Sequence, residues 1–286
     1  MKKSIDHDYL SYNTEKRSND HYFDHLERKI MNKQHRFSRI AEICKEKGEV
    51  SVEELVKEIE VSPATIRRDL QDMEELKIIT RYHGGAKFSS KQYDEPHMIL
   101  KSETNVKEKQ AIALKAASLI KDSQMVYLDA GSTTFEMIKY IHAKNITVVT
   151  PGIRHILELA RKEIFTIVLG GPLRPETEAI AGRNTVEQIK EMYFDIAFIG
   201  TNGIHEKVGF TTSNEMEAAT KNTAVKQSKI PFIVTDSSKF FLLNPVQFAR
   251  LNDAIIISDS IPKEFLNLHV NYVLSSGKTN CQSLLK

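Results

Sequence analysis

The spacing of apolar residues separates a short helical part of the chain from a longer part in which strands and helices alternate. Apolar residues at helical spacing, followed by Gly48, predict a first helix over residues 36–47. Ser51 with Glu54 three residues later makes a capping box and predicts a second helix over 51–60. We therefore expect the first part of the chain to be a compact group of short helices.

A third helix and a hairpin complete this part. Ser62 is a favourable N-cap and Pro63 a favourable first residue, and Ile66, Leu70 and Met73 form the apolar seam of the helix they start. The stretch IITRYHGGAKF that follows predicts two short strands joined at a pair of glycines. Three short helices and a hairpin are the parts of a winged helix-turn-helix.

From about residue 105 the pattern changes to short apolar strands that alternate with helices. The predicted strands cover 125–129, 146–150, 165–170, 195–200, 231–236, 254–258 and 270–274. The predicted helices cover 105–121, 133–143, 152–162, 184–191 and 215–227. This order is typical of a mainly parallel sheet with helices on both faces. The expected fold class is α/β, with an N-terminal winged helix-turn-helix and a C-terminal mainly parallel α/β domain.

The same patterns divide the chain into five segments. We expect a polar, disordered extension over 1–33, the winged helix-turn-helix over 34–88, a linker over 89–104, the α/β domain over 105–262, and a C-terminal segment over 263–286 that ends in a last strand and a tail. Met31 lies just before the first patterned segment. Translation either starts at Met31 or includes a genuine N-terminal tail, and the pattern leaves both open.

Composition and charge exclude several classes of protein. The net charge of the 286 residues is +2, so no overall basicity indicates nucleic acid. The N-terminus lacks the apolar core of a signal peptide, and the apolar runs are too short to span a bilayer. Cys44 and Cys281 offer neither a disulfide framework nor metal-ligand spacing. We expect a cytoplasmic protein with no membrane segment, metal or cofactor.

The outward face of the third helix carries residues that suit DNA reading. Ala64, Arg68 and Gln71 point away from the apolar seam, and Thr65 and Arg67 flank them. An arginine there can fork onto a guanine in the major groove. Residues 36–88 contain ten Lys or Arg and eleven Asp or Glu. Their net charge does not indicate DNA binding, so the prediction depends on where the basic residues lie. The alternative is an ordinary helical domain with surface arginines.

The hairpin adds further basic residues around its two glycines, whose backbone could approach a phosphate closely. The N-cap residues of the second and third helices add hydroxyl groups. The candidate DNA contacts are Ser51, Ser62, Ala64, Thr65, Arg67, Arg68, Gln71, Arg81, His83, Gly84, Gly85 and Lys87.

This stretch also resembles a known family. SPATIRRDLQDMEELKIITRYHGGA is similar to the recognition helix and wing of the DeoR family of bacterial transcriptional repressors. Two family runs are matched, Ser/Thr-x-x-Thr-Ile-Arg-Arg-Asp-Leu from Ser62 to Leu70 and Arg-x-His-Gly-Gly-Ala from Arg81 to Ala86. The resemblance implies that Thr65, Arg67 and Arg68 contact operator DNA. Asp69 is expected to orient an arginine, since its carboxylate would repel phosphate.

The run YLDAGSTTFEMI joins a predicted strand to a predicted helix. Gly131 and the helix start can direct backbone N–H groups at an anion, and Ser132, Thr133 and Thr134 add hydroxyl groups. The alternative is a plain strand–helix turn with a Ser/Thr cap. The run contains neither a P-loop pattern nor a Gly-x-Gly-x-x-Gly pattern, so a nucleotide site is not expected.

Glycines, hydroxyl groups and charges follow other predicted strands as well. Ligands bind outside the carboxyl ends of the strands in open parallel sheets, so these residues are expected to share one site. They suit a small phosphorylated, polyhydroxylated ligand. Carboxylates could accept hydrogen bonds from its hydroxyl groups, and a lysine could bind its phosphate. The candidate effector-binding residues are Asp129, Gly131, Ser132, Thr133, Thr134, Gly170, Gly171, Gly200, Asn202, Gly203, Asp236 and Lys239.

Residues 105–260 resemble the DeoR-family effector domain through DAGSTT, TVVT, LGG, FDIAFIGTNGI, GFTT and TDSSKF. That resemblance implies a fold shared with ribose-5-phosphate isomerase and a pocket for a phosphorylated sugar. It implies a repressor of a carbohydrate-use operon that binds operator DNA as a homodimer or homotetramer. An activator or dual regulator is the alternative. Pro151, Gly152 and His205 depart from the family pattern near the expected pocket.

An isomerase-like enzyme is the alternative of a different class. Isomerisation needs a carboxylate that shuttles a proton between adjacent carbons. The run FIGTNGIH is poor in acids, and Glu215 and Asp195 are interpreted as structural or surface residues. No catalytic residue is therefore predicted.

Overall fold

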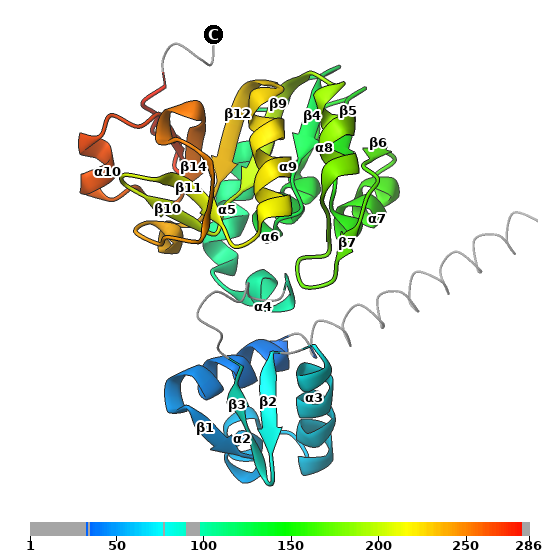
Figure 1. The fold of residues 1–286 in the computed structure, drawn as a ribbon, viewed down its shortest axis with the longest axis vertical. Coiled ribbons are helices and arrows are strands. Elements are labelled where there is room, and N and C mark those ends of the chain that lie inside the picture. The colour runs from blue at the N-terminus through cyan, green and yellow to red at the C-terminus, as the bar shows by residue number, and fades with distance from the viewer. Residues whose placement is uncertain (1–32, 34, 77, 90–97, 282–286) are drawn as a thin grey trace, which may run out of the picture. The chain divides into compact units, whose positions relative to one another are not determined.

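The computed structural model describes residues 33, 35–76, 78–89 and 98–281, in two compact units, residues 1–89 and 90–286 (Figure 1). The extension expected over 1–33 lies outside the described residues except for Lys33, as does the part of the expected linker at 90–97.

The first unit is a winged helix-turn-helix. Its elements are a helix over residues 35–47, β1 (Glu49–Ser51), α2 (Val52–Ile59), α3 (Pro63–Glu75), β2 (Ile79–Tyr82) and β3 (Gly85–Phe88). The predicted helix starts are confirmed. Ser51 and Glu54 form a complete capping box, and Ser62 accepts a hydrogen bond from the N–H of Thr65 with Pro63 in the first turn.

The wing has one strand more than the sequence predicts. Strand β1 pairs antiparallel with β3, so the sheet has the order β1-β3-β2. A strand of three residues is too short to show alternation. Gly85 is buried where β1 pairs with β3, and a Cβ on Gly85 would lie 2.3 Å from the carbonyl oxygen of Val50. Gly85 is therefore needed for strand packing, and Gly84 (φ +93°) for the turn.

The second unit is built on a seven-stranded parallel sheet of order β15-β14-β12-β9-β4-β5-β6. Its strands are β4 (Met125–Leu128), β5 (Thr147–Thr150), β6 (Phe165–Val168), β9 (Phe194–Gly200), β12 (Ser228–Val234), β14 (Ile255–Ser258) and β15 (Tyr272–Leu274). The predicted parallel α/β fold is confirmed.

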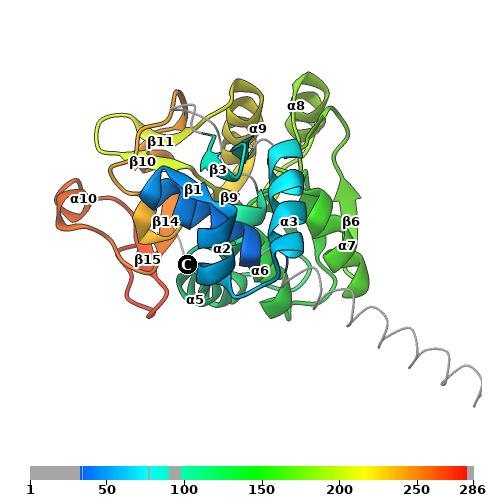
Figure 2. The same ribbon diagram turned by 90° about the horizontal axis from the view of Figure 1, so that it is seen from below.

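Helices cover both faces of this sheet (Figures 1 and 2). One face carries α5 (Val106–Ala117), α6 (Ser132–Met137) with the 3₁₀ turn Ile138–Tyr140, and α7 (Ile153–Arg161). The other carries α8 (Arg183–Lys190) and α9 (Glu215–Lys226). Successive strand residues face opposite sides, so Val126 and Leu128 join one apolar cluster and Tyr127 the other.

The structure corrects the predicted boundaries of this unit. Residues 98–103, assigned to the linker, form helix α4 (Met98–Glu103), because Met98 and Leu100 are buried and the N–H of Met98 donates to the carbonyl of Glu176. Strand β15, assigned to a separate C-terminal segment, pairs with β14. The unit therefore extends on both sides of 105–262.

Several short elements were not predicted. They are the hairpin of β7 (Leu173–Arg174) and β8 (Ala179–Ile180), the antiparallel sheet of β10 (Gly203–His205), β11 (Gly209–Thr212) and β13 (Val246–Ala249), the 3₁₀ turns Ser237–Lys239 and Leu251–Asp253, and α10 (Lys263–Asn267). Two- to five-residue elements are too short for a period to be recognised. The β7–β8 hairpin matters most, because it borders the pocket described below.

Candidate functional site

The outer face of α3 is exposed as the sequence predicts. Ala64, Arg67, Arg68 and Gln71 are exposed, whereas the seam residues Ile66, Leu70 and Met73 are buried. Thr65 is half-buried, and its hydroxyl lies 2.9 Å from that of Ser62. The helix therefore presents two arginines and a glutamine to solvent from a fixed first turn.

Asp69 fixes α3 to the first helix. It is 2% exposed and accepts hydrogen bonds from Nε and Nη2 of Arg36 at 2.6 and 3.0 Å. The hydrogen bonds that Arg36 donates to Asp69 raise the pKa of Arg36. Asp69 was expected to orient an arginine, and its partner proves to be Arg36 on the helix over residues 35–47. This ion pair thus joins α3, which carries the outward arginines, to the first helix.

The wing places its basic residues on the surface. Arg81, His83 and Lys87 are exposed, and Arg81 is 3.7 Å from Glu74. The hydroxyl of Ser51 belongs to the capping box, where it lies 2.9 Å from a carboxylate oxygen of Glu54. Of the wing candidates, buried Gly85 is the one that packing withdraws from the surface.

In the second unit, a buried ion pair marks the carboxyl ends of β4 and β9. Asp129 follows β4, is 3% exposed, and accepts from the N–H of Gly200 at 2.9 Å. Lys221 of α9 donates to the same carboxylate oxygen and to the carbonyl of Gly200 at 3.2 Å. Gly131 lies close to Gly200, because a Cβ added to Gly131 would be 3.9 Å from the Cα of Gly200.

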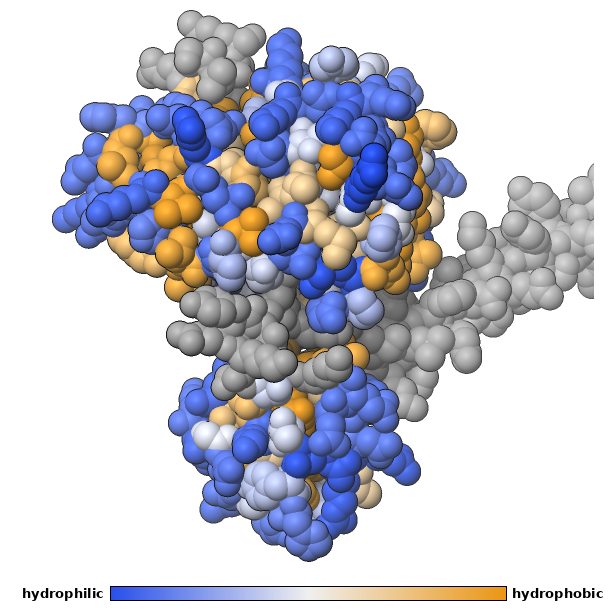
Figure 3. Space-filling view, in the orientation of Figure 1, coloured by the Kyte–Doolittle hydropathy of each residue, from blue (hydrophilic) through white to orange (hydrophobic). Residues whose placement is uncertain are grey.

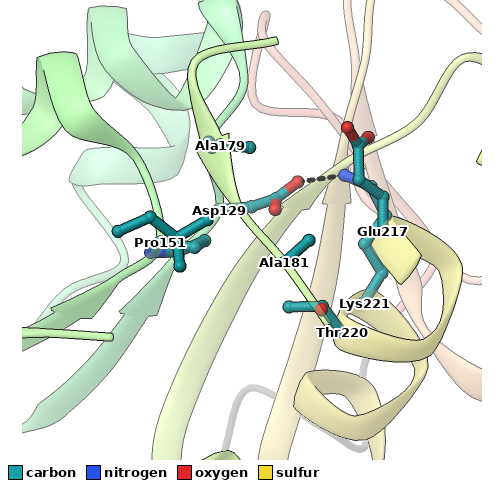
Figure 4. A pocket seen from close by; sticks show the side chains of 9 residues that line it. Asp129, Pro151, Ala179, Ala181, Glu217, Thr220 and Lys221 are labelled. Carbon is teal, nitrogen blue, oxygen red and sulfur yellow. Dashed lines mark hydrogen bonds and ion pairs between the residues drawn. The ribbon is translucent and has the colours of Figure 1, made fainter. Parts of the chain in front are cut away.

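A pocket lies over this ion pair (Figure 4). Charged and hydroxyl groups on α9 and just after β4 face apolar groups just after β5 and at the β7–β8 hairpin. The lining residues are Asp129, Ala130, Pro151, Ala179, Ile180, Ala181, Glu217, Thr220 and Lys221. The pocket thus offers two carboxylates, an ammonium group and a hydroxyl beside an apolar wall.

Glu217 ties this pocket to the hairpin beside it. It is 6% exposed and accepts from the hydroxyl of Thr177 at 2.7 Å and from Nε of Arg174 at 3.1 Å. Glu217, Thr220 and Lys221 were not predicted. Their spacing of three and four residues puts them on one face of a helix, and this spacing is the feature of the sequence that could have identified them.

The loop after β4 is held by its own side chains. Thr134 is fully buried, with its hydroxyl 2.5 Å from the carbonyl of Asp129, 2.9 Å from the N–H of Gly131 and 3.1 Å from Nε2 of His155. Thr134 was expected to hold the ligand, but it supports the loop. Ser132 is half-buried and Thr133 is 7% exposed.

The predicted glycine pair after β6 packs against α8. Gly170 exchanges hydrogen bonds with Gln188 and accepts one from Thr185. A Cβ on Gly171, whose φ is +148°, would lie 2.5 Å from the hydroxyl of Thr185. These glycines allow close helix packing, and neither lines the pocket. Gly203 likewise packs closely, against the carbonyl of Leu242.

Lys239, in the 3₁₀ turn Ser237–Lys239, is close in sequence to another predicted residue, Asp236. Its carboxylate accepts from Asn105 at 2.8 Å and from the N–H and hydroxyl of Ser238. Burial raises the pKa of Asp236, but the Ser238 hydrogen bonds, the charges of Lys239 and Lys109, and Asn105 outweigh it, so the pKa lies below its usual value.

Asn202 contacts α4, because its side-chain oxygen accepts a hydrogen bond from Lys101 at 3.2 Å. Lys101 and Lys109 were not predicted, since they lie before the motifs that the sequence analysis used.

The departures at Pro151, Gly152 and His205 have separate explanations. Pro151 lines the pocket. Gly152 leaves room for His155, because a Cβ there would lie 2.3 Å from its Nδ1. His205 lies in β10, with its Nδ1 3.3 Å from the N–H of Lys207, and is not among the residues lining the pocket.

His155 predicts a pH-dependent stability. Burial lowers its pKa from 6.5 to about 3, against the opposing charge of Asp129. The unfolded chain takes up this proton below pH 6.5 and the folded chain only near pH 3, so each pH unit lost in this window should cost up to about 1.4 kcal/mol of unfolding free energy. Urea unfolding of wild type and His155→Gln from pH 7 to 4 measures it. Equal pH slopes would contradict the assignment.

In the described part of the chain, no helix is both long and apolar enough to cross a membrane. Within the same ranges, no group of three His, Cys, Asp or Glu side chains is placed to hold a metal ion. The two acids considered for an isomerase do not line the pocket. Glu215 is exposed, and Asp195 accepts from the N–H of Met125 at the opposite, amino end of β4.

A winged helix-turn-helix followed by a parallel α/β unit with a pocket at its strand ends defines a ligand-responsive DNA-binding regulator. The DeoR-like helix-turn-helix domain matches residues 36–92, and the DeoR C-terminal sensor domain matches residues 104–260. The chain belongs to the DeoR family of transcriptional regulators.

Individual relatives agree with this family. The HTH-type transcriptional regulator FruR of Bacillus subtilis is 43% identical over 73% of this chain and 84% of its own length. The glycerol-3-phosphate regulon repressor of Escherichia coli is 35% identical over the same shares. Ribose 5-phosphate isomerase from Plasmodium falciparum is 16% identical over 50% of this chain and 53% of that one, with a TM-score of 0.35, a likeness too distant to indicate function.

Arg68→Ala tests the DNA-reading face. Loss of a guanine contact should weaken operator binding by about 1–3 kcal/mol and relax sequence preference at one base pair. Gel-shift titration on operator and on unrelated DNA of equal length measures both effects. An equal loss on the two DNAs would show that Arg68 contacts only the backbone.

Proposed function

We propose that this protein represses a carbohydrate-use operon and that a phosphorylated sugar modulates its hold on the operator. Support comes from its family and from relatives named as repressors of the lactose phosphotransferase system in Staphylococcus epidermidis and of the glycerol-3-phosphate regulon in Escherichia coli. An activator of the same architecture remains the second candidate, because the fold does not fix the sign of regulation.

The pocket over the Asp129–Lys221 ion pair is the observation that carries this proposal. The two carboxylates can accept hydrogen bonds from the hydroxyl groups of a sugar, and the ammonium group can donate to its hydroxyl and carbonyl oxygens. Its apolar wall can cover the carbon face of the ligand. Asp129, Gly131, Ser132, Thr133, Gly200, Asn202, Asp236 and Lys239 remain proposed effector residues, joined now by Glu217, Thr220 and Lys221.

The proposed DNA contacts lie on α3, at the starts of α2 and α3, and on the wing. The exposed Arg67 and Arg68 are proposed to read bases, and the exposed Arg81, His83 and Lys87 are proposed to bind phosphates. Ser51, Ser62, Ala64, Thr65, Gln71 and Gly84 complete the proposed set. In this view the protein works in the cytoplasm, where the operator is accessible.

A homo-oligomer is part of the proposal, because helix-turn-helix proteins bind paired half-sites as dimers. The second unit exposes apolar side chains that a second subunit could cover. Figure 3 shows hydrophobic side chains, in orange, on the surface of the second unit. Phe241, Leu242 and Leu243 are exposed, and the ring of Phe241 lies 5.3 Å from that of Phe265 in α10. Phe165 and Leu157 are exposed on β6 and α7.

We propose that the pocket senses its ligand without converting it. Asp129 is engaged by Lys221 and Gly200, and Glu217 by Thr177 and Arg174, so both carboxylates are already hydrogen-bonded. A general base must reach a substrate proton directly. Turnover of an aldose or ketose phosphate that disappears in Glu217→Gln would contradict the sensor proposal.

Operator-binding titration of the full chain against a panel of sugar phosphates tests the function. The panel should pair fructose 1-phosphate, fructose 6-phosphate, galactose 6-phosphate and glycerol 3-phosphate with their unphosphorylated forms. We expect one phosphorylated compound to shift the operator dissociation constant, and its unphosphorylated form to leave it unchanged. If no phosphorylated compound shifts operator binding, the proposed effector class is wrong.

A further inference from the structure

Strand β6 is an open edge of the seven-stranded sheet. It lies at one end of the strand order, and among the described residues β5 is the strand that pairs with it (Figures 1 and 2). The N–H of Leu169 donates to the carbonyl of Thr150 in β5. Backbone groups of successive residues alternate in direction, so those of Thr166 and Val168 point away from β5. Such a row of outward groups is a template for another strand.

The opposite edge of the sheet is covered by the chain itself. The chain folds back along β15, where Val273 and Thr279 form an antiparallel bridge and the N–H of Leu274 donates to the carbonyl of Lys278. The two edges therefore differ, because in the described part of the chain β15 is protected and β6 is open.

The open edge lacks the features that usually protect one. Lysines, prolines and bulges commonly keep edge strands from pairing. Residues 164–173, IFTIVLGGPL, contain no charged side chain, and β6 has neither a proline nor a bulge in its register with β5. Phe165 is 70% exposed, and Val168 and Leu157 of the neighbouring helix α7 are exposed as well. An uncharged strand with exposed apolar side chains suits pairing with another strand.

A second copy of the chain is the partner that this edge fits. An uncharged strand can meet its own copy without like-charge repulsion. A two-fold axis perpendicular to the sheet places the same strand of two subunits side by side and antiparallel. The proposed function independently requires a dimer, since helix-turn-helix proteins bind paired half-sites.

We propose that two subunits pair through β6, antiparallel about a two-fold axis at Ile167, and form one continuous sheet. This inference rests on the proposed homo-oligomer and names its interface. In this register Thr166 of each subunit opposes Val168 of the partner subunit, so the outward N–H and carbonyl groups of both residues form hydrogen bonds between the subunits. The pairing also covers the exposed side chains of Phe165 and Val168.

Cysteine cross-linking of the full chain tests this register. Ile167 would face its own copy in a pair without direct hydrogen bonds, with Cα atoms about 4.5 Å apart, within the range of a disulfide. Thr166→Cys is the matched control, because residue 166 and its copy would be more than about 7 Å apart. With oxidised glutathione, Ile167→Cys should form covalent dimers and Thr166→Cys should not. Cys44 and Cys281 are buried, so the wild type should run as a single chain on a denaturing gel.

Sedimentation velocity measures the same interface without a change at Ile167. Phe165→Lys places an ammonium group in the apolar contact and should raise the dimer dissociation constant at least about 10-fold. Leu268→Lys is the matched control, since Leu268 is also an exposed apolar residue but caps the end of α10. Its dissociation constant should equal that of the wild type.

Each contrary result overturns the inference. These results are a monomeric wild type, an unchanged dissociation constant in Phe165→Lys, a dimer lost in Leu268→Lys alone, and a well-folded Ile167→Cys variant that cross-links no more than Thr166→Cys. The Phe165→Lys measurement decides the matter if Ile167→Cys fails to fold.

The outcomes also separate this inference from the proposed function. If a sugar phosphate shifts operator binding of the wild type while Phe165→Lys remains fully dimeric, the β6 interface is wrong and the sensor proposal stands. If the β6 variants behave as expected but no sugar phosphate shifts operator binding, the interface stands and the proposed effector class fails.

Discussion

The Asp129→Ala variant should lose about 3–5 kcal/mol of unfolding free energy in the second unit, because it leaves Lys221 as a buried charge without its carboxylate. The side chains of Lys221 and Asp129 are 10% and 5% exposed, and Asp129 also accepts from the N–H of Gly200. The variant also removes an acceptor from the proposed pocket. Urea unfolding followed by circular dichroism measures the loss.

Two comparisons make this result specific. In the double variant Asp129→Asn with Lys221→Met neither charge remains, so much of the lost stability should return. Glu187→Ala breaks the Glu187–Lys190 pair, whose side chains are 57% and 56% exposed, and should change stability little. A loss for Asp129→Ala no larger than that for Glu187→Ala would show that the buried pair does not hold the strand ends together.

The Asp69→Ala variant should destabilise the winged helix-turn-helix by about 3 kcal/mol, the lower end for a buried pair because Arg36 remains 22% exposed. Since the pair joins α3 to the first helix, operator binding should fall with stability. Asp72→Ala is the matched control on the same helix. Its pair with Lys33 is exposed at 38% and 45%, so at most about 1 kcal/mol is expected.

Unfolding and operator binding of Asp69→Ala should be measured together. Full operator affinity in a stable Asp69→Ala variant would mean that Arg67 and Arg68 do not depend on the Arg36 contact for their position. Loss of stability with unchanged operator affinity at low temperature would show that Asp69 contributes to folding but not to DNA binding.

Much of the fold could be predicted from local patterns. Alternation of strands and helices specified the parallel sheet, since strands buried on both faces read as short apolar runs. The starts of α2 and α3 were predictable because Ser51, Ser62 and Pro63 act within one turn of the chain. Helix α4 was missed because it spans only six residues, and its hydrogen bond from Met98 goes to Glu176, which is distant in sequence.

The candidate site was harder to predict, because its contacts join distant parts of the chain. Lys221 meets Asp129 across 92 residues, and no local motif announces the pairing. The glycines at 170 and 171 follow a strand end as pocket residues do, yet close packing against Thr185 and Gln188 explains them. Sequence position at a strand end therefore indicated the region, and side-chain direction decided which residues line it.

The most direct test of ligand-controlled DNA binding is a thermodynamic linkage measurement on the full chain. Calorimetry gives the dissociation constant of the active sugar phosphate with and without saturating operator DNA. If the phosphorylated sugar weakens operator binding, operator DNA must weaken sugar-phosphate binding by the same factor, expected to be roughly 5- to 150-fold. Equal sugar-phosphate affinity in the presence and absence of operator DNA would contradict the account.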